Sequence, residues 1–334
     1  MAIDLVESKR NATEDYEPAI IDEFRKESVI LDTLMFDDVV NPAGGGATLD
    51  YGYRRQTTQP TAGFRAIGSE YTKQRVTTSK HSVTLAVLGG AFELDRVEAK
   101  LGPAASGIIT HNIAQKVKAT RTAFQDAVIN GDVAVDANSF DGLDKALTGS
   151  STEFRATQVT DWRDLDAANL ANKALDDLDE FLSLLDGTPT LLLGNKAVLA
   201  KVRGIARRAS QYVKSPIEGL LGPNGRPIVR EEYGGVLFAD PGDKAGSATP
   251  IIPIETRTVG VSTTGLTDLY AYRVALDGFH GVSTVGGQLV QAWLPDFTTS
   301  GPVKTGEVEL GPTGVALKAT KAAAVFRNIR VSGT

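Results

Sequence analysis

The side chains best suited to acid–base chemistry in this sequence are its three histidines, His81, His111 and His280. Each stands alone in a different segment, without the HxH or HExxH spacing that brings two imidazoles to one metal ion. The GxSxG, Walker-loop and GxGxxG motifs, which position a nucleophile or a phosphate, are also missing. We therefore expect a protein that is not an enzyme. The catalytic alternative is a hydrolase that uses His280 or His111 with an aspartate.

Carboxylates cluster in the segment 176–180, where oxygen ligands could in principle hold a hard cation. These acids, Asp176, Asp177, Asp179 and Glu180, are expected on one exposed helix face, where they would only interact with solvent. The chain has no cysteine, which excludes disulfides, thiolate metal sites and cysteine nucleophiles. We expect neither a metal nor a cofactor.

Length and composition indicate a folded chain with room for two domains, because 42% of its 334 residues are hydrophobic and 23% are charged. The N-terminal MAIDLVESKR has early acids and no apolar run, so we expect no secretory signal, and no segment is apolar enough to span a membrane. A net charge of −6 argues against the whole protein gripping duplex DNA. Any contact with nucleic acid is expected to be local and non-specific.

Charge is distributed unevenly over the first eighty residues. Residues 1–40 contain eleven acids and four bases, a net charge of −7, whereas residues 48–81 contain six bases and two acids, a net charge of +4. The glycine-rich joint NPAGGGA separates them. The two segments are therefore electrostatically complementary.

Residues 48–85 have the Thr, Val and Tyr content of strands but few apolar side chains to anchor them in a core. We expect two strands of about fifteen residues joined near 59–63, where a turn cluster occurs. At about 3.3 Å per residue this hairpin would be roughly 50 Å long. Because a two-stranded ribbon alone is marginally stable in water, the sequence predicts that it lies on another surface.

One long helix is predicted over 103–130, since Pro103 suits a first turn and Gly131 a stop. Its apolar residues recur at helical spacing. The buried face is expected to contain Ile109, Ile113, Val117, Phe124 and Val128, and the residues expected mostly off that face are Lys116, Lys118, Arg121 and Gln125.

The rest of the chain alternates helix and strand and then becomes all strand. A second helix is predicted from an Asp161 N-cap to residue 186, followed by a buried strand in TPTLLLGN and a third helix from Lys196. Residues 227–297 carry strand and turn patterns that include ATPIIPIE, 248–255. The tail, 306–331, is predicted to add further strand.

The run from Lys196 to Lys214 contains six bases and no acid. A solvated helix face is the simplest interpretation. The main alternative is an ionic contact with the acidic helix 161–186 of a neighbouring copy, whose net charge is −6. Nucleic-acid binding is a third alternative, although only Tyr212 could stack on a base.

The order of these elements resembles that of the major capsid proteins of tailed bacteriophages, whose fold is shared by herpesvirus capsid floors and bacterial encapsulin shells. The similarity rests on the limb PTAGFRAIGSEYTKQRVTT, the long helix, DLDEFLSLLDGTPTLLLGNKAVLAKVRGIAR, the GGVLFADPGD turn and the closing VELGPTGVALKATKAAAVFRNIRV. It covers nearly the whole chain, although no single motif is invariant.

The resemblance implies an α+β capsid fold with an N-terminal arm, an extended loop, a spine helix, a peripheral domain and an axial α/β domain. The implied boundaries are 1–43 for the arm, 44–82 for the loop, 83–157 for the peripheral domain, 158–297 for the axial domain and 298–334 for the return to the peripheral domain.

The implied function is that of a major capsid protein that assembles as pentamers and hexamers into an icosahedral head around double-stranded DNA, after synthesis in the host cytoplasm. An encapsulin-like compartment is the alternative. Many relatives begin with a segment that is cleaved or acts as a scaffold, and here the arm starts at Met1; a separate scaffolding protein, or none, is expected, with portal and decoration proteins as further partners. The expected interface residues are Glu23, Glu27, Asp37, Asp38, Arg54, Arg55, Arg65, Glu70, Lys73, Arg75, Lys80, Arg207 and Arg208.

Overall fold

A computed structural model describes eight segments of the chain, namely residues 29–40, 48–97, 103–165, 168–208, 212–221, 227–233, 235–284 and 290–333. For residues 103–110, 168, 212–221 and 227–231 the description covers the backbone only. Most of the expected arm lies outside the described residues, and so do the interface candidates Glu23 and Glu27.

The described elements alternate between short helices and strands around one long helix. The first part of the chain forms α2 (Val29–Thr33), β1 (Phe36–Asp37), β2 (Asp50–Gln56), β3 (Thr78–Thr84), β4 (Ala86–Asp95), α3 (Pro103–Asn130), α4 (Leu143–Leu147), β5 (Glu153–Phe154) and β6 (Thr160–Asp161). The second part forms α5 (Ala168–Ser183), β7 (Leu191–Gly194), α6 (Lys196–Arg208), β8 (Tyr212–Leu221), β9 (Pro227–Tyr233), β10 (Val236–Ala239), β11 (Glu255–Val259), β12 (Val261–Tyr272), β13 (Phe279–Ser283), β14 (Val290–Trp293), β15 (Val303–Leu317), a 3-10 turn (Thr320–Ala322) and β16 (Ala323–Arg330).

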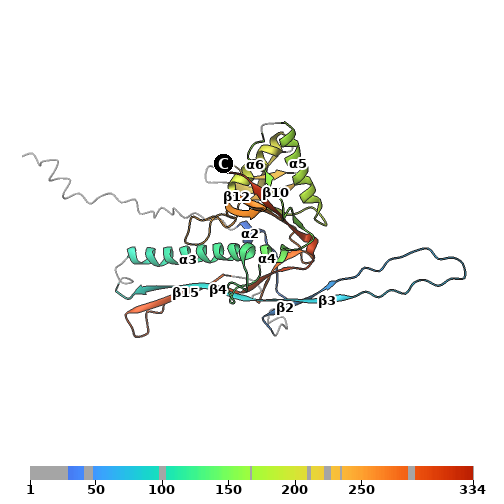
Figure 1. Ribbon diagram of the computed structural model, residues 1–334. Helices are drawn as coiled ribbons and strands as arrows, with labels where there is room; N and C mark the ends of the chain where they lie inside the picture. Colours follow the sequence, from blue (N-terminus) through green and yellow to red (C-terminus); the bar gives the residue numbers. More distant parts are fainter. Residues whose placement is uncertain are drawn as a thin grey trace, which may run out of the picture.

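Two larger sheets and one separate hairpin organise these strands (Figure 1). One sheet has the order β1-β13-β15-β14, with β4 also paired to β15, and lies along α3. The other has the order β5-β16-β12-β7-β10-β9-β8, with β6 and β11 attached to β16 and β12. The α+β class predicted from the sequence is confirmed.

The central strands of the second sheet, β7, β12 and β16, are mostly buried on both faces. Leu192 of β7 packs with α5 and α6, whereas Leu191 and Leu193 face the core that α3 and α4 share with the first sheet. Because neighbouring side chains on a strand point to opposite faces, the run LLLG contributes to two cores at once. This strand was predicted as buried, which is confirmed.

The long helix begins and ends where the sequence predicts, at Pro103 and Asn130. Its buried face includes Phe124 and Val128, as expected. The expectation for Gln125 was wrong, because this side chain is fully buried and its Oε1 accepts a hydrogen bond from the backbone N–H of Ile30 at 3.1 Å. The glutamine thus connects α2 to the spine helix.

The second helix starts later than predicted. Thr160 and Asp161 pair with β16 instead of capping a helix, and α5 begins at Ala168. Trp162 is fully buried and its indole contacts Phe326 edge-on, with ring centroids 5.5 Å apart. Packing of this large side chain keeps the segment extended and overrides the capping signal.

The strand predicted over 248–255 is also wrong, since β11 begins only at Glu255. Two prolines within the segment remove backbone donors that a ladder would need. Ile251 and Ile252 are instead buried as part of a loop, whose carbonyls accept hydrogen bonds from the amides of Asn130 (2.8 Å) and Asn195 (2.9 Å).

The hairpin turns at a different place from the predicted 59–63. The register Asp50↔Thr84 and Gln56↔Thr78 places its midpoint near residue 67, and the N–H of Ser69 donates to the carbonyl of Ala66 there. Gly68 has φ of +91°, which a residue without Cβ adopts at low cost. The turn cluster predicted from Pro60 and Gly63 therefore lies in an extended limb.

Strand pairing connects the segments that the resemblance implies. β13 and β14 belong by sequence to 158–297 but pair with β15, whereas β16 of the C-terminal tail pairs with β12. In the described part of the chain, no helix is both long and apolar enough to cross a membrane.

Candidate subunit interface

The hairpin of β2 and β3 is attached to the body by one face of its base. Alternate residues of β2 point to opposite sides, so Tyr51, Tyr53 and Arg55 share one face. The hydroxyl of Tyr53 donates to the carbonyl of Leu317 at 2.9 Å. The guanidinium of Arg55 donates to the carbonyls of Leu317 at 2.8 Å and Lys318 at 3.0 Å. The interface candidate Arg55 thus binds the end of β15 in its own chain.

A buried polar cluster lies beneath this base, where β1, β2 and β13 meet. The hydroxyl of Tyr51 donates to Oδ2 of Asp37 at 2.8 Å and lies 3.3 Å from Nε2 of His280. The ammonium of Lys318 lies 3.9 Å from the same carboxylate and 5.4 Å from the centre of the Tyr51 ring. Asp37, an interface candidate, therefore takes part in holding the hairpin to its own body.

His280 is close to an aspartate, as the hydrolase alternative requires, with Nε2 3.9 Å from Oδ2 of Asp37. It is nevertheless fully buried under the hairpin, where a substrate could not reach it. His111 is half-buried on α3. Across the described segments, no group of three or more histidine, aspartate or glutamate side chains could hold a metal ion. The cluster favours a role in positioning the hairpin.

We expect attachment of the hairpin to weaken in mild acid. Burial, followed by the charge of Lys318, holds the pKa of His280 below its ordinary 6.5, against the opposing effect of Asp37. The docked hairpin therefore favours the neutral imidazole of His280. This preference stabilises docking fully above pH 6.5, and the stabilisation is lost as the pH falls through the lowered pKa of His280. Amide hydrogen exchange in β2 and β3, corrected for intrinsic rates, should accelerate between about pH 7 and 5.

The matched control is His81, which lies on β3 of the hairpin itself, opposite Tyr53. His280→Gln should abolish most of this pH dependence, whereas His81→Gln should preserve it. Equal pH dependence in both variants would contradict the role given to His280.

Beyond its base the hairpin extends away from the molecule (Figure 1), and every residue from Gln56 to Thr78 is exposed. Its limbs are joined to each other by polar contacts. The hydroxyls of Thr58 and Thr77 lie 2.9 Å apart, and the amide of Gln74 donates to the hydroxyl of Thr61 at 2.7 Å. The limb thus keeps an extended form without resting on its own body.

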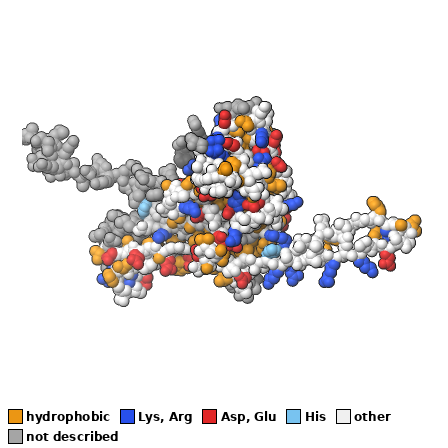
Figure 2. Space-filling model, in the orientation of Figure 1, with side chains coloured by type: hydrophobic (Ala, Val, Ile, Leu, Met, Phe, Trp, Pro, Cys, Tyr) orange, Lys and Arg blue, Asp and Glu red, His pale blue; other side chains and the backbone are white. Residues whose placement is uncertain are grey.

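The exposed side chains of the hairpin include six of the thirteen predicted interface residues. Arg54 and Lys80 are directly opposite each other on the strand pair, an arrangement that is destabilising when the charges are alike. Within the described residues no ion pair involves the candidates Arg54, Arg65, Glu70, Lys73, Arg75 and Lys80. Figure 2 shows the basic side chains projecting along the limb. An acidic partner would relieve their mutual repulsion.

The tip carries an apolar group that sequence reasoning missed. Phe64 and Ile67 are as exposed as free side chains, at 110% and 104%, and Tyr71 is exposed at 65%. The guanidinium of Arg65 lies 5.4 Å from the centre of the Tyr71 ring. The spacing of three large apolar residues within eight positions was the available signal, but the polar residues around them concealed it.

The remaining candidates lie elsewhere. Asp38 is exposed beside β1, and Arg207 and Arg208 are exposed at the end of α6 in the lobe distant from the hairpin (Figure 1). Arg207 donates to the carbonyl of Arg203 at 3.2 Å, and Arg208 donates to the carbonyl of Leu165. The structure does not bring these two arginines together with the hairpin residues.

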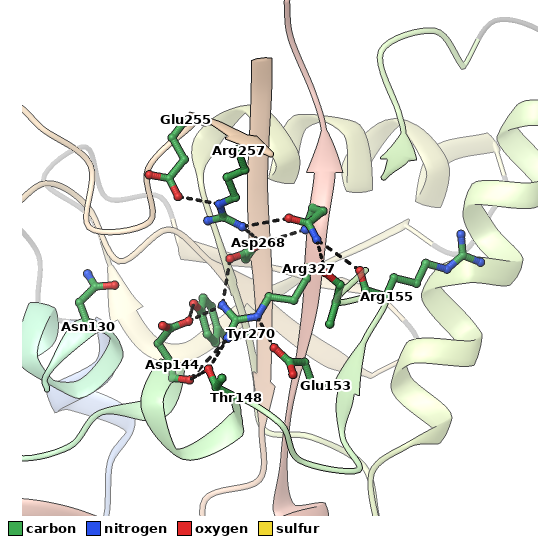
Figure 3. A network of polar contacts seen from close by, with 12 residues as sticks. Asn130, Asp144, Thr148, Glu153, Arg155, Glu255, Arg257, Asp268, Tyr270 and Arg327 are labelled. Carbon is green, nitrogen blue, oxygen red and sulfur yellow. Dashed lines mark hydrogen bonds and ion pairs between the residues drawn. The ribbon is translucent and has the colours of Figure 1, made fainter. Parts of the chain in front are cut away.

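A second set of charges, not predicted from the sequence, forms a network between α4, β5, β11, β12 and β16 (Figure 3). Arg327 contacts Asp144, Glu153 at 3.0 Å and Asp268 at 3.2 Å. Arg257 contacts the other oxygen of Asp268 at 2.7 Å. Because Asp268 is only 2% exposed, both guanidinium groups compensate a carboxylate that has lost its water.

Tyr270 completes this network by donating its hydroxyl to Asp144 at 2.8 Å. Burial, followed by the carboxylates of Asp268 and Asp144, raises the pKa of Tyr270 well above its ordinary value, so the hydroxyl remains a donor. The contacts join segments more than a hundred residues apart. We interpret the network as structural, since its central carboxylates are already bound by arginines.

Comparison with known proteins finds similar structures but no similar sequences among protein families and curated proteins. No protein-family model matches the sequence, and no curated protein matches it either. The capsid of an empty GTA particle matches with a TM-score of 0.61 at 13% identity, covering 96% of both chains. A chain from Mycobacterium phage Bobi matches with a TM-score of 0.60 at 11% identity, covering 100% of both.

The chain has the tailed-phage major capsid fold. The same fold is found in the SrpI encapsulin of Synechococcus elongatus PCC 7942, which matches with a TM-score of 0.59 at 13% identity and covers 100% of this chain and 98% of that one. The fold predicted from the ordered elements is therefore confirmed.

Proposed function

We propose that this chain is the major capsid protein of a tailed bacteriophage and that it assembles into a closed icosahedral shell around double-stranded DNA. The observation that carries the proposal is the hairpin, whose base is anchored by buried polar contacts while residues 56–78 are exposed. The outer part of the hairpin is polar and makes no contact with the described body of its own chain, as expected for a segment that binds another copy. The matches to capsid chains supply the same expectation from the fold.

The subunits would meet through many weak contacts. An exposed ion pair contributes about 0–1 kcal/mol, so a misplaced subunit can dissociate, whereas contacts repeated through a closed symmetric shell add to a stable particle.

We place the arm at 1–43, the extended loop at 44–82, the peripheral domain at 83–157 with 298–334, and the axial domain at 158–297. Copies would associate through the axial domain as pentamers and hexamers, and separate scaffolding, portal and decoration proteins are further proposed partners.

Packaged DNA would be contacted without sequence specificity, and the protein, made in the host cytoplasm, would end in the virion. A second candidate is an encapsulin-like compartment that encloses cargo protein, which the SrpI match favours. Neither function uses a catalytic site.

The deciding experiment is electron microscopy of the purified chain, with nuclease treatment of any particles. Closed shells of uniform size support a shell-forming function, and nuclease-resistant DNA in particles isolated from a producing host separates the phage head from the cargo compartment. A monodisperse monomer under all assembly conditions would exclude both.

A further inference from the structure

The long helix α3 carries several bases and a single acid. Before Asp126, its sequence contains Lys116, Lys118 and Arg121 but no aspartate or glutamate. The ammonium of Lys244, on the loop after β10, lies 3.4 Å from the carboxylate of Asp126. Because this ion pair offsets the one negative charge, the helix has a net positive charge. We call Lys116, Lys118 and Arg121 the α3 patch.

Two residues of the α3 patch line a cavity between α3 and β4. The cavity has a volume of about 290 Å³, and its polar lining side chains are Asn112, Gln115, Lys116 and Lys118. None of the described residues that line it is an acid. Ammonium and amide groups donate hydrogen bonds to phosphate oxygens, which a carboxylate would repel. The cavity therefore suits a phosphate group better than it suits a cation.

Arg121 extends the α3 patch along the helix. It is exposed and follows Lys118 by three residues, a spacing that places two side chains on the same helix face. At a rise of 1.5 Å per residue, the two are about 4.5 Å apart along the axis. Lys116 lies nearer the sheet, where its Nζ is 3.6 Å from the position that a Cβ on Gly90 would occupy. The patch thus covers the middle of the helix.

The opposite side of the same layer is acidic. In Figure 1, α3 lies along one side of β4 and β15. Phe92 of β4 lines the cavity beside α3, so its neighbour Glu93 points to the other side of the sheet. Glu307 of β15 pairs with Ala91 and shares that side with Glu93, and both glutamates are exposed. Helix and strands thus form a layer with bases on one side and acids on the other.

This polarity of charge predicts how the layer is oriented in the proposed phage head, whose interior holds a polyanion. Duplex DNA carries one negative charge per about 1.7 Å of its axis, so it attracts the basic side of the layer and repels the acidic side. The N-terminal segment 1–28 is a weaker competitor for the α3 patch, because its eight acids are offset by four bases.

We propose that α3 faces the inside of the shell and that the α3 patch binds phosphate groups of the packaged duplex, one of them in the cavity between α3 and β4. The inference rests on the proposed phage-head function and names the surface that contacts the genome. Phosphate contacts carry no sequence information, so the binding is non-specific. A few contacts per copy keep it weak, and the duplex can slide as it enters and leaves.

Lysine acetylation in intact particles tests this placement. Particles that contain DNA and particles that are empty are treated with a small acylating reagent, and peptide mass spectrometry measures the modification of each lysine. Lys116 and Lys118, which are only half-buried, should react several-fold more slowly in the particles that contain DNA. The matched controls are the exposed Lys73 on the hairpin and Lys196 on α6, which should react equally in both.

The outcomes separate the inference from the function on which it rests. Slower reaction of Lys116 and Lys118 in DNA-containing particles alone supports the inference. Equal rates in full and empty particles overturn it and leave the shell function intact, and slow reaction in both would show that protein, such as the segment 1–28, covers the patch instead of DNA. If the particles never contain DNA, the phage-head function fails, and the inference fails with it.

The salt dependence of DNA binding gives an independent measurement. Lys116→Gln, Lys118→Gln and Arg121→Gln are combined in one chain, and its affinity for a short duplex is measured against salt concentration. Loss of three phosphate contacts should reduce the slope of log affinity against log salt by about 2.7. The control chain combines Lys173→Gln, Lys196→Gln and Lys321→Gln, which remove the same charge from other exposed positions.

The control chain should keep the slope of the unaltered chain, and equal melting temperatures of the three chains would show that all are folded. Equal slopes in the α3 variant and the control would overturn the proposal, because the charge of the α3 patch would then have no special role in binding DNA.

Discussion

Reversing the charge of Arg65, Lys73 and Arg75 to Glu should leave the subunit folded and abolish closed shells. All three side chains are exposed on the outer hairpin, so no buried contact is lost. The change converts the basic limb into an acidic one, which would then be repelled by acidic surfaces of neighbouring copies. Circular dichroism and the melting temperature of the subunit should match the unaltered chain, while microscopy shows only monomers or small oligomers.

Two comparisons show whether the location of the charges matters. Replacing the same residues with Gln should give an intermediate yield of shells, and reversal of Lys173 and Lys321, exposed on the body, should have little effect. Normal particles from the hairpin triple variant would show that these charges are incidental to assembly.

Arg327→Met should be the most destabilising single substitution among the charged residues of the network. Its guanidinium compensates Asp268, which is 2% exposed, and also contacts Asp144 and Glu153. Removing one partner of a buried ion pair typically costs about 3–5 kcal/mol, and because Arg257 still contacts the other oxygen of Asp268 we expect a loss at the lower end of this range. Chemical denaturation of the unassembled subunit should show a clearly lower midpoint with an unchanged slope.

The matched control is Arg163→Met, because Arg163 forms an ion pair with Asp161 in which both side chains are partly exposed, at 35% and 46%. We expect little change in its denaturation midpoint, since solvent screens such pairs. If Arg327→Met were as mild as Arg163→Met, the network would not hold α4 and β16 together as we infer. A double variant that also carries Asp268→Asn should recover part of the loss, because the buried carboxylate that has lost one of its two guanidinium partners is then replaced by a neutral amide.

The elements that were predicted correctly are those whose structure depends on residues close together in the sequence. The spine helix was predicted to the residue because Pro103, Gly131 and the apolar repeat act over short distances. The strand at Leu191–Gly194 and the helix at Lys196–Arg208 were predicted for the same reason. The exposed hairpin was also foreseen, because a strand-like segment without apolar anchors has no place in its own core.

Predictions failed where distant contacts override a local preference. Asp161 has the residue type of an N-cap but lies in a strand, because burial of Trp162 against Phe326 outweighs a cap worth about 1 kcal/mol. Gln125 was placed on the exposed side, yet it is buried because Ile30 brings a backbone donor that needs an acceptor. The interface residues and the domain boundaries remain predictions.

The sequence by itself determined the kind of elements, their order and the polar character of the hairpin, because these follow from spacing and residue type along the chain. Only the tertiary structure decided which charges are structural and which are free for another copy. Arg55 and Arg327 are bound within the chain, whereas Arg54 and Arg75 are exposed. The physical reason is that desolvation and pairing depend on residues hundreds of positions away, which approach only when the sheets form.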